Sequence, residues 1–425
     1  MPQITVKFFP LINNQAFIAT RNNAWIGFQG LIPPLLTQTL QLVRNERRSL
    51  TGGPQAPPLA LMPNWHIPLQ TLGVPGMIDA NFAPSAAFQT LPAQPGNYAG
   101  LPDRDKIQYC TEIMHWLKSG PQKRWLIALD NLAAQAINNI ITIESGPDIL
   151  LVFALPEFYF TYTPDAGHRR ATTTNYSKPF YSHLLDRLFL GHDVAGQAVR
   201  AASMCELAKN NQNVLIVAGT MRWKKINELD HSAETIYNTM PAFSNKTKLW
   251  TKIKTSSIDG YFNRGTMVQP DYKKGPAGAV ASQAAAALAP MPANVKHLNA
   301  PYLDFTFHRN DGRTSRIRIG LEICKDHQSG IMADYFWSPF RSNPHFQVVT
   351  AAGVATTPGN IKNKTKKMLL VDAGASPAAG AGGGGIYSIG GVPTPWTGAD
   401  PNAFTQPQPP VATGSFGKCE FVLNL

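Results

Sequence analysis

The run from Asp148 to Leu155 is apolar at every position after its aspartate. An unbroken run of this kind is typical of a strand buried on both faces, because a strand with one face in water alternates polar and apolar residues. The run Val214–Ala218 has the same character. Strands are predicted at 124–129, 148–155 and 214–218, with helical patterns between them at 131–141 and 184–209. This alternation of strand and helix predicts an α/β fold.

Four further runs form two antiparallel pairs in our prediction, 236–243 with 248–254 and 302–308 with 316–323. Asn310-Asp311-Gly312 separates the second pair and is a strong hairpin signal. Three more strands are predicted at 347–352, 368–372 and 419–425. We interpret the Gly-rich stretch 382–391 as flexible backbone, because it lacks the Lys-Ser/Thr pair that follows a phosphate-binding loop.

The composition changes along the chain and predicts its domain organisation. The run Ile4–Phe9 resembles a strand, but prolines and glycines recur every few residues from 51 to 102. We therefore predict an N-terminal accessory region, 1–120, followed by one large domain, 121–425. An Ala/Pro/Gly-rich stretch at 275–293 is predicted to be a low-complexity insertion in that domain.

The composition of the 425 residues, 44% hydrophobic and 15% charged, is typical of a soluble globular protein. The four cysteines lie far apart, which argues against a disulfide framework and a cysteine-based zinc site and fits a reducing compartment. No stretch is long and apolar enough to span a bilayer, and the first residues lack the pattern of a signal peptide. These features predict a cytoplasmic protein, with export by another route left open.

The net charge of +12 raises the question of an acidic partner. The positive residues lie in short scattered clusters, and no nucleic-acid-binding module can be identified. We interpret the charge as solvated surface and predict no specific nucleic-acid partner.

Three residues whose side chains could act in catalysis each follow or end a predicted strand: Glu157, Lys252 and Cys324. Each also has a plain interpretation. Glu157 can be a solvated carboxylate at the end of a strand, and Lys252 can belong to the exposed face of an edge strand. A free cysteine is often a small buried hydrophobic residue. In this order within one α/β pattern, however, they resemble the Glu-Lys-Cys triad of the nitrilase superfamily, the carbon–nitrogen hydrolases.

The resemblance extends to the residues around the triad, from about 122 to 330. Leu155-Pro156-Glu157-Phe158 is similar to the Pro-Glu signature of the family, and Tyr237-Asn238-Thr239 to the start of its lysine hairpin. Gly320-Leu321-Glu322-Ile323-Cys324-Lys325-Asp326 resembles the nucleophile motif. The resemblance implies an α-β-β-α sandwich, often paired into homodimers, with no metal and no cofactor. Residues 1–120 lie outside it.

The resemblance also implies the roles of these residues. Cys324 would attack an amide or nitrile carbon, and Glu157 would serve as general base and acid. Lys252 and the backbone N–H of Lys325 would stabilise the oxyanion. Lys254 is the second candidate lysine. It is two residues from Lys252, so both would point to the same side of a strand.

A second carboxylate of the family corresponds here to Asp259, in Ile258-Asp259-Gly260-Tyr261, where aliphatic amidases have glutamate. The aspartate side chain is one methylene shorter and reaches about 1.3 Å less, which bears on the efficiency or the substrate of a hydrolase and not on the triad. A plain Asp-Gly turn is an equal alternative. The sequence thus predicts a hydrolase of non-peptide carbon–nitrogen bonds that acts on a small amide or nitrile. An acyltransferase with the same triad, or a catalytically idle scaffold used for binding, are the alternatives.

Overall fold

The computed structural model describes residues 2–12, 43, 45–47, 49–50, 98–107, 109–110, 130, 133–157, 159–160, 176–177, 203–226, 234–253, 295–338, 340–352, 357–372, 385–388, 394–395 and 415–425. Within these residues the chain forms two β-sheets with helices packed against them, which confirms the α/β class. The predicted insertion at 275–293 and the predicted strand at 124–129 lie outside the described residues.

The larger sheet has ten strands among the described residues. They are β1 (Gln3–Ile12), β2 (Ile149–Ala154), β3 (Tyr176–Ser177), β4 (Val214–Val217), β5 (Met221–Ile226), β6 (Glu234–Phe243), β7 (Thr247–Thr251), β8 (Val295–His297), β15 (Ser415–Phe416) and β16 (Cys419–Asn424). Their main order is β15-β1-β2-β4-β6-β5-β3, and β16 also pairs with β1, while β7 pairs with β6 and β8. The strands β1, β2 and β4 are parallel, and β6 runs against β4.

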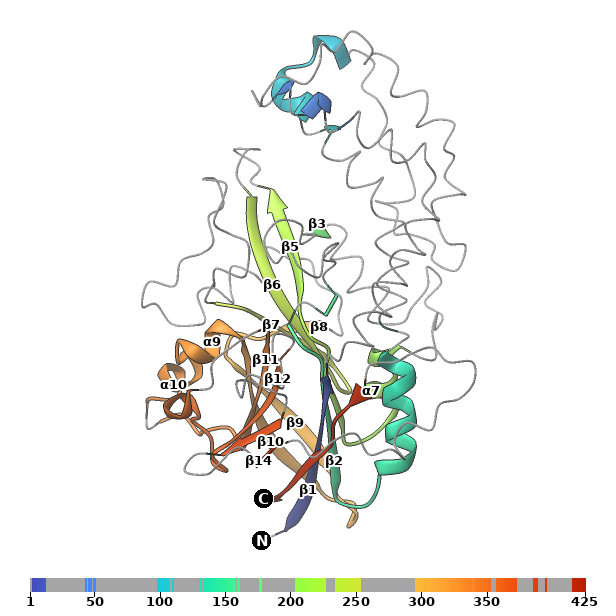
Figure 1. The fold of residues 1–425 in the computed structure, drawn as a ribbon, viewed down its shortest axis with the longest axis vertical. Helices are drawn as coiled ribbons and strands as arrows, with labels where there is room; N and C mark the ends of the chain where they lie inside the picture. The colour runs from blue at the N-terminus through green and yellow to red at the C-terminus, as the bar shows by residue number, and fades with distance from the viewer. Residues whose placement is uncertain are drawn as a thin grey trace.

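The strand β1 corrects the predicted domain boundary. It pairs in parallel with β2 from Thr5↔Ile149 to Pro10↔Ala154, and with β16 on its other side. Residues 3–12 therefore belong to the sheet of the large domain and not to a separate accessory region. The two chain ends meet in this sheet, where the Leu425 N–H donates to the Pro2 carbonyl over 3.0 Å (Figure 1).

The smaller sheet has six strands in the order β14-β13-β12-β11-β10-β9. They are β9 (Tyr302–His308), β10 (Thr314–Ile323), β11 (Phe346–Ala351), β12 (Lys367–Asp372), β13 (Gly385–Ser388) and β14 (Thr394–Pro395). The predicted hairpin is confirmed, with β9 and β10 antiparallel and Gly312 at φ +79° in the turn. The prediction of flexible backbone is wrong for 385–388, because these residues pair with β12 and bury Ile386.

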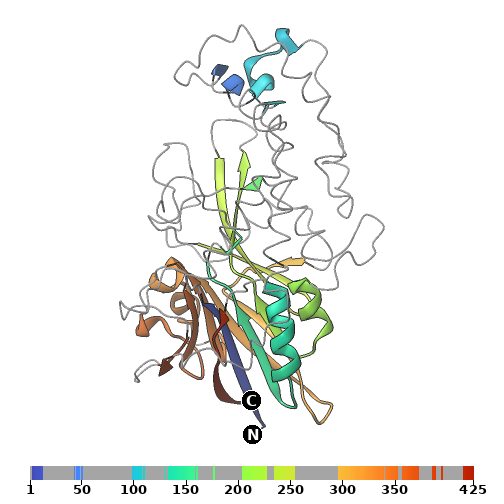
Figure 2. The same cartoon turned by 45° about the vertical axis from the view of Figure 1, so that its right-hand side comes forward.

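Helices cover the outer faces of the two sheets (Figures 1 and 2). The helix at 133–144 and α7 (Met204–Asn210) pack on the larger sheet through one apolar cluster, which includes Ile137, Phe153 and Ile216. A second cluster contains residues of both sheets, among them Val152 of the larger sheet and Ile319 and Val348 of the smaller one. The short helices α9 (Lys325–Gln328) and α10 (Ile331–Tyr335) pack against β10.

The described residues also include two 3-10 turns, η3 (Tyr98–Gly100) and η6 (Pro358–Asn360). No helix among the described residues is long and apolar enough to cross a membrane.

Candidate active site

Glu157 lies just beyond the carboxyl end of β2. Pro156 precedes it and ends the ladder, because proline has no N–H to donate to a neighbouring strand. The Glu157 backbone N–H donates instead to the Ala351 carbonyl at the end of β11, over 3.3 Å. This bond joins the ends of the two sheets. The Glu157 side chain is buried, with 2% of the residue exposed.

Gly219 supports this strand end from the chain that follows β4. Its φ is +76°, and a Cβ there would lie 2.6 Å from the Pro156 carbonyl oxygen. Gly219→Ala is expected to destabilise the fold by about 2–3 kcal/mol, from the left-handed backbone and from the clash. Gly312→Ala is the matched control, because Gly312 also has a positive φ but nothing lies within 4 Å of its Cβ position. Urea unfolding of both variants checks this, and equal losses would show that the contact with Pro156 is unimportant.

Lys252 contacts Glu157 from the end of the antiparallel hairpin of β6 and β7 in the larger sheet. β7 ends at Thr251, so Lys252 comes directly after the strand. The predicted strand 248–254 had placed Lys252 inside it. The Lys252 Nζ lies 2.7 Å from Glu157 Oε1, and both side chains are 1% exposed or less. The structure therefore places the ammonium of Lys252 against the carboxylate. Lys254 lies outside the described residues.

Asn238 is part of this site, although no role for its side chain is predicted from the sequence. Its Nδ2 donates to Glu157 Oε1 over 2.9 Å, and its backbone carbonyl accepts from the Lys252 N–H over 2.8 Å. One residue of β6 thus fixes both members of the ion pair. The signal was present in Tyr237-Asn238-Thr239, but which side chain it would contact depends on how β2 and β6 are placed in the sheet.

A polar ladder on the other face of the hairpin fixes its register. The Trp223 Nε1–H donates to Thr239 Oγ1 over 2.9 Å, and the Thr239 and Thr251 hydroxyls lie 2.9 Å apart. Thr251 in turn lies 2.8 Å from His297 Nε2. Burial lowers the pKa of His297 to about 4, so the ring is neutral at pH 7. Because side chains alternate across a strand, this ladder leaves Asn238 and Met240 on the opposite face of β6.

Cys324 follows β10 directly, in a backbone conformation that is unusual for a residue with a side chain. Its φ is +46° and its ψ is −104°. Such a conformation costs free energy and persists only where the surroundings hold it. The Cys324 N–H donates to the Thr350 carbonyl over 2.8 Å, and the Cys324 carbonyl accepts from the His327 N–H over 3.0 Å. The chain is therefore held on both sides of the cysteine.

Cys324 is 4% exposed, and the pKa of its thiol is raised above the usual value. Burial is the main cause, followed by the charge of Glu157, and a hydrogen bond to Glu157 also favours the protonated thiol. The charge of Lys252 and a hydrogen bond from the backbone of Ala352 act in the opposite direction. At neutral pH the sulfur is thus a thiol beside a carboxylate, and it must lose its proton to become a nucleophile.

Asp326 connects the turn at Cys324 to the chain that follows β7. Its side chain is fully buried, and its Oδ1 accepts from the Ile253 N–H over 2.9 Å. The residue after Lys252 is therefore bonded to the residue two positions after Cys324. Lys325 is the first residue of α9, and no helix carbonyl accepts its backbone N–H.

The structure thus brings together Glu157, Lys252 and Cys324, which the sequence places on three separate strand ends. Asp259 lies outside the described residues. Among the described residues, no group of three or more His, Cys, Asp or Glu side chains could hold a metal ion.

Comparison with known proteins identifies no family for the chain. No protein-family model matches the chain, and a search of curated proteins found no match either.

Proposed function

We propose that the protein is a hydrolase that cleaves a non-peptide carbon–nitrogen bond, in a small amide or in a nitrile, through a cysteine acyl-enzyme. The observation that supports this most directly is the buried contact between Glu157 and Lys252, 2.7 Å apart, beside the Cys324 thiol. A buried ion pair is costly to form, so it is poor evidence for stability alone. A titratable group whose pKa is shifted by burial and by a neighbouring charge, as that of Cys324 is, is typical of a functional site.

In the proposed reaction the Cys324 sulfur attacks the carbonyl carbon of an amide while its proton passes to Glu157. The oxyanion that forms is stabilised by the Lys252 ammonium and the backbone N–H of Lys325. Glu157 then gives its proton to the departing nitrogen, and the carbon–nitrogen bond breaks to leave a thioester. Glu157 next takes a proton from water, whose oxygen attacks the thioester, and the proton returns to the sulfur as the acid leaves. In a nitrile, attack of the sulfur gives a thioimidate that keeps the nitrogen. One water then adds to this carbon and ammonia leaves, which gives the thioester, and a second water hydrolyses it as above.

The finer fold that we propose is the α-β-β-α sandwich of the nitrilase superfamily. Its support is the packing of two sheets through one apolar cluster, with helices on the outer face of each. Pairing into homodimers and a cytoplasmic location stay predictions.

A scaffold without activity is the second candidate, and one observation favours it. Cys324 is buried and its thiol pKa is raised, as is usual for a structural cysteine. A scaffold does not need a base beside the thiol, however, and Glu157 lies there with Lys252 and Asn238 bonded to it.

Intact-mass spectrometry separates the two functions. The protein is incubated with a mixed pool of amides and nitriles, and its mass is compared with that of the Cys324→Ala variant. We expect an added acyl mass on the wild type alone, and its conversion to a hydroxamate when hydroxylamine is added. A wild type that gains no mass and releases no ammonia from any member of the pool would favour the scaffold.

A further inference from the structure

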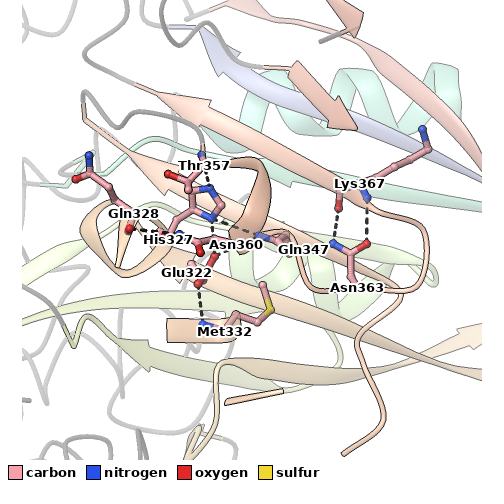
Figure 3. Close-up of polar contacts among 9 residues, drawn as sticks. All are labelled: Glu322, His327, Gln328, Met332, Gln347, Thr357, Asn360, Asn363 and Lys367. Carbon is pink, nitrogen blue, oxygen red and sulfur yellow. Dashed lines mark hydrogen bonds and ion pairs between the residues drawn. The ribbon is translucent and has the colours of Figure 1, made fainter. Parts of the chain in front are cut away.

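Two buried polar side chains flank Cys324 and take no part in the proposed reaction. Glu322 lies near the end of β10 and His327 lies in α9, and both are fully buried. The Glu322 Oε2 lies 2.9 Å from His327 Nδ1 (Figure 3). A buried carboxylate is costly unless its oxygens are satisfied, so its partners show what this group holds in place.

The carboxylate of Glu322 is bonded at both oxygens. Its Oε1 accepts from the Met332 backbone N–H over 3.0 Å, and its Oε2 also accepts from Gln347 Nε2 over 3.2 Å. The Gln347 Oε1 in turn accepts from Asn363 Nδ2 over 3.0 Å. Glu322 is thus a fixed anchor between β10, α10 and β11.

His327 is held in one orientation and one tautomer. The Thr357 backbone N–H donates to His327 Nε2 over 3.2 Å, so this nitrogen must carry a lone pair. The ring proton therefore lies on Nδ1, where it is donated to Glu322. A second bond runs beside the first, from Asn360 Nδ2 to the His327 carbonyl over 2.7 Å. Together they tie α9 to the chain at 357–360.

The chain at 357–360 continues from a segment that touches both the nucleophile and the base. Thr350 accepts from the Cys324 N–H, and Ala351 accepts from the Glu157 N–H. The backbone of Ala352 donates to the Cys324 sulfur and lowers the thiol pKa. Thr357, the residue bonded to His327, follows Ala352 by five positions. Ala352 thus contacts the reacting sulfur and Thr357 is bonded to His327, while the four residues between them lie outside the described part of the chain.

We propose that His327 is a positioning residue, which holds Thr357 so that the backbone of Ala352, five positions earlier in the chain, stays against the Cys324 sulfur. Glu322 sets the tautomer that makes this possible. The inference rests on the proposed function for its catalytic meaning, but the contact itself can be tested through the chemistry of the thiol alone.

Two substitutions separate the two bonds of His327. His327→Gln places an amide oxygen near the position of Nε2, so it can accept from Thr357 but loses the bond to Glu322. His327→Asn places an amide N–H near the position of Nδ1, so it keeps Glu322 and loses Thr357. The rate of iodoacetamide labelling of Cys324 is measured against pH and assigned to this cysteine by peptide mass. The charged groups that face the sulfur, Glu157 and Lys252, are unchanged in both variants.

We expect His327→Gln to keep the wild-type pH profile. His327→Asn should move the profile upward by about one pH unit, the effect of losing one hydrogen bond to a charged group. On any substrate that the wild type accepts, kcat of His327→Asn should fall about tenfold with KM little changed. If His327→Gln is as impaired as His327→Asn, or if neither changes the profile, the proposal is wrong. A wild type without turnover would contradict the proposed function, yet it would leave the labelling comparison decisive.

A third variant covers the case in which both histidine variants fail to fold. Asn360→Ala removes the bond from the same segment to the His327 carbonyl and should move the labelling profile in the same direction. Asn211→Ala is its matched control, because Asn211 Nδ2 donates to the Leu207 carbonyl over 2.8 Å at the end of α7. An Asn360→Ala profile identical to that of Asn211→Ala would overturn the proposal.

Discussion

Cys324→Ala is expected to abolish turnover, by at least about 10⁴-fold, because the alanine has no atom that can form the acyl-enzyme. The loss should appear in kcat. We expect no other residue to take over as nucleophile, because backbone bonds to Thr350 and His327 hold the turn in a single conformation. Ammonia release from any accepted amide or nitrile measures it. An alanine variant that releases ammonia at the wild-type rate would remove Cys324 from the mechanism.

The same variant should keep its fold. The substitution removes one sulfur atom and leaves unchanged the two backbone bonds that hold the turn, so we expect the free energy of unfolding to change by about 1 kcal/mol or less. Thermal unfolding checks this. Cys205→Ala is a useful control, because Cys205 is also buried and burial raises its pKa to about 12. That variant should keep wild-type turnover, which separates the loss of a nucleophile from the loss of a buried thiol.

The second large effect is expected at the buried ion pair of Glu157 and Lys252. Glu157→Gln should lower turnover by at least about 10²-fold, because the amide cannot take the thiol proton. Lys252→Met should lower turnover by a similar factor of about 10², because the oxyanion loses a donor. Each single variant should also destabilise the fold by about 3–5 kcal/mol, since it breaks a buried pair and leaves the other charge without this partner.

The double variant Glu157→Gln with Lys252→Met distinguishes the two effects. It removes both charges, so its free energy of unfolding should exceed that of either single variant, while its turnover should stay low. Urea unfolding and ammonia release are measured on all four proteins. Lys209→Met is the surface control, because Lys209 lies 3.6 Å from Glu206 and is 48% exposed, and it should cost less than about 1 kcal/mol. Stability losses that simply add would show that the pair is not coupled, and full turnover in Lys252→Met would transfer the role to Lys254.

Much of the chain could be predicted from the sequence because the relevant signals are local. The apolar run at 149–154 and the Asn-Asp-Gly turn specify a strand and a hairpin through burial and backbone preference alone, and the structure has both. Glu157 and Cys324 could be singled out for the same reason, since Cys324 comes directly after a predicted strand and Glu157 follows one with only Pro156 between. These features need no knowledge of what lies across the molecule.

Only the tertiary structure decided the contacts between distant segments. The strand at 3–12 looked separate from the large domain, but it pairs with β2 on one side and with β16 on the other, both more than a hundred positions away in the sequence. Residues 385–388 form a strand although they begin with glycine, because the edge of β12 supplies the hydrogen bonds that local propensity does not. Sequence periodicity cannot reveal such partners.

The site divides in the same way. The sequence by itself determined the residue types and their strand ends, but periodicity could not choose between Lys252 and Lys254, and it gave no role to Asn238, Asp326 or His327. The structure places Lys252 Nζ 2.7 Å from Glu157 and bonds Asn238 to the same carboxylate. Because hydrogen bonds of about 3 Å demand exact alignment of separate strands, they depend on sheet order and packing, which the sequence specifies only through the whole fold.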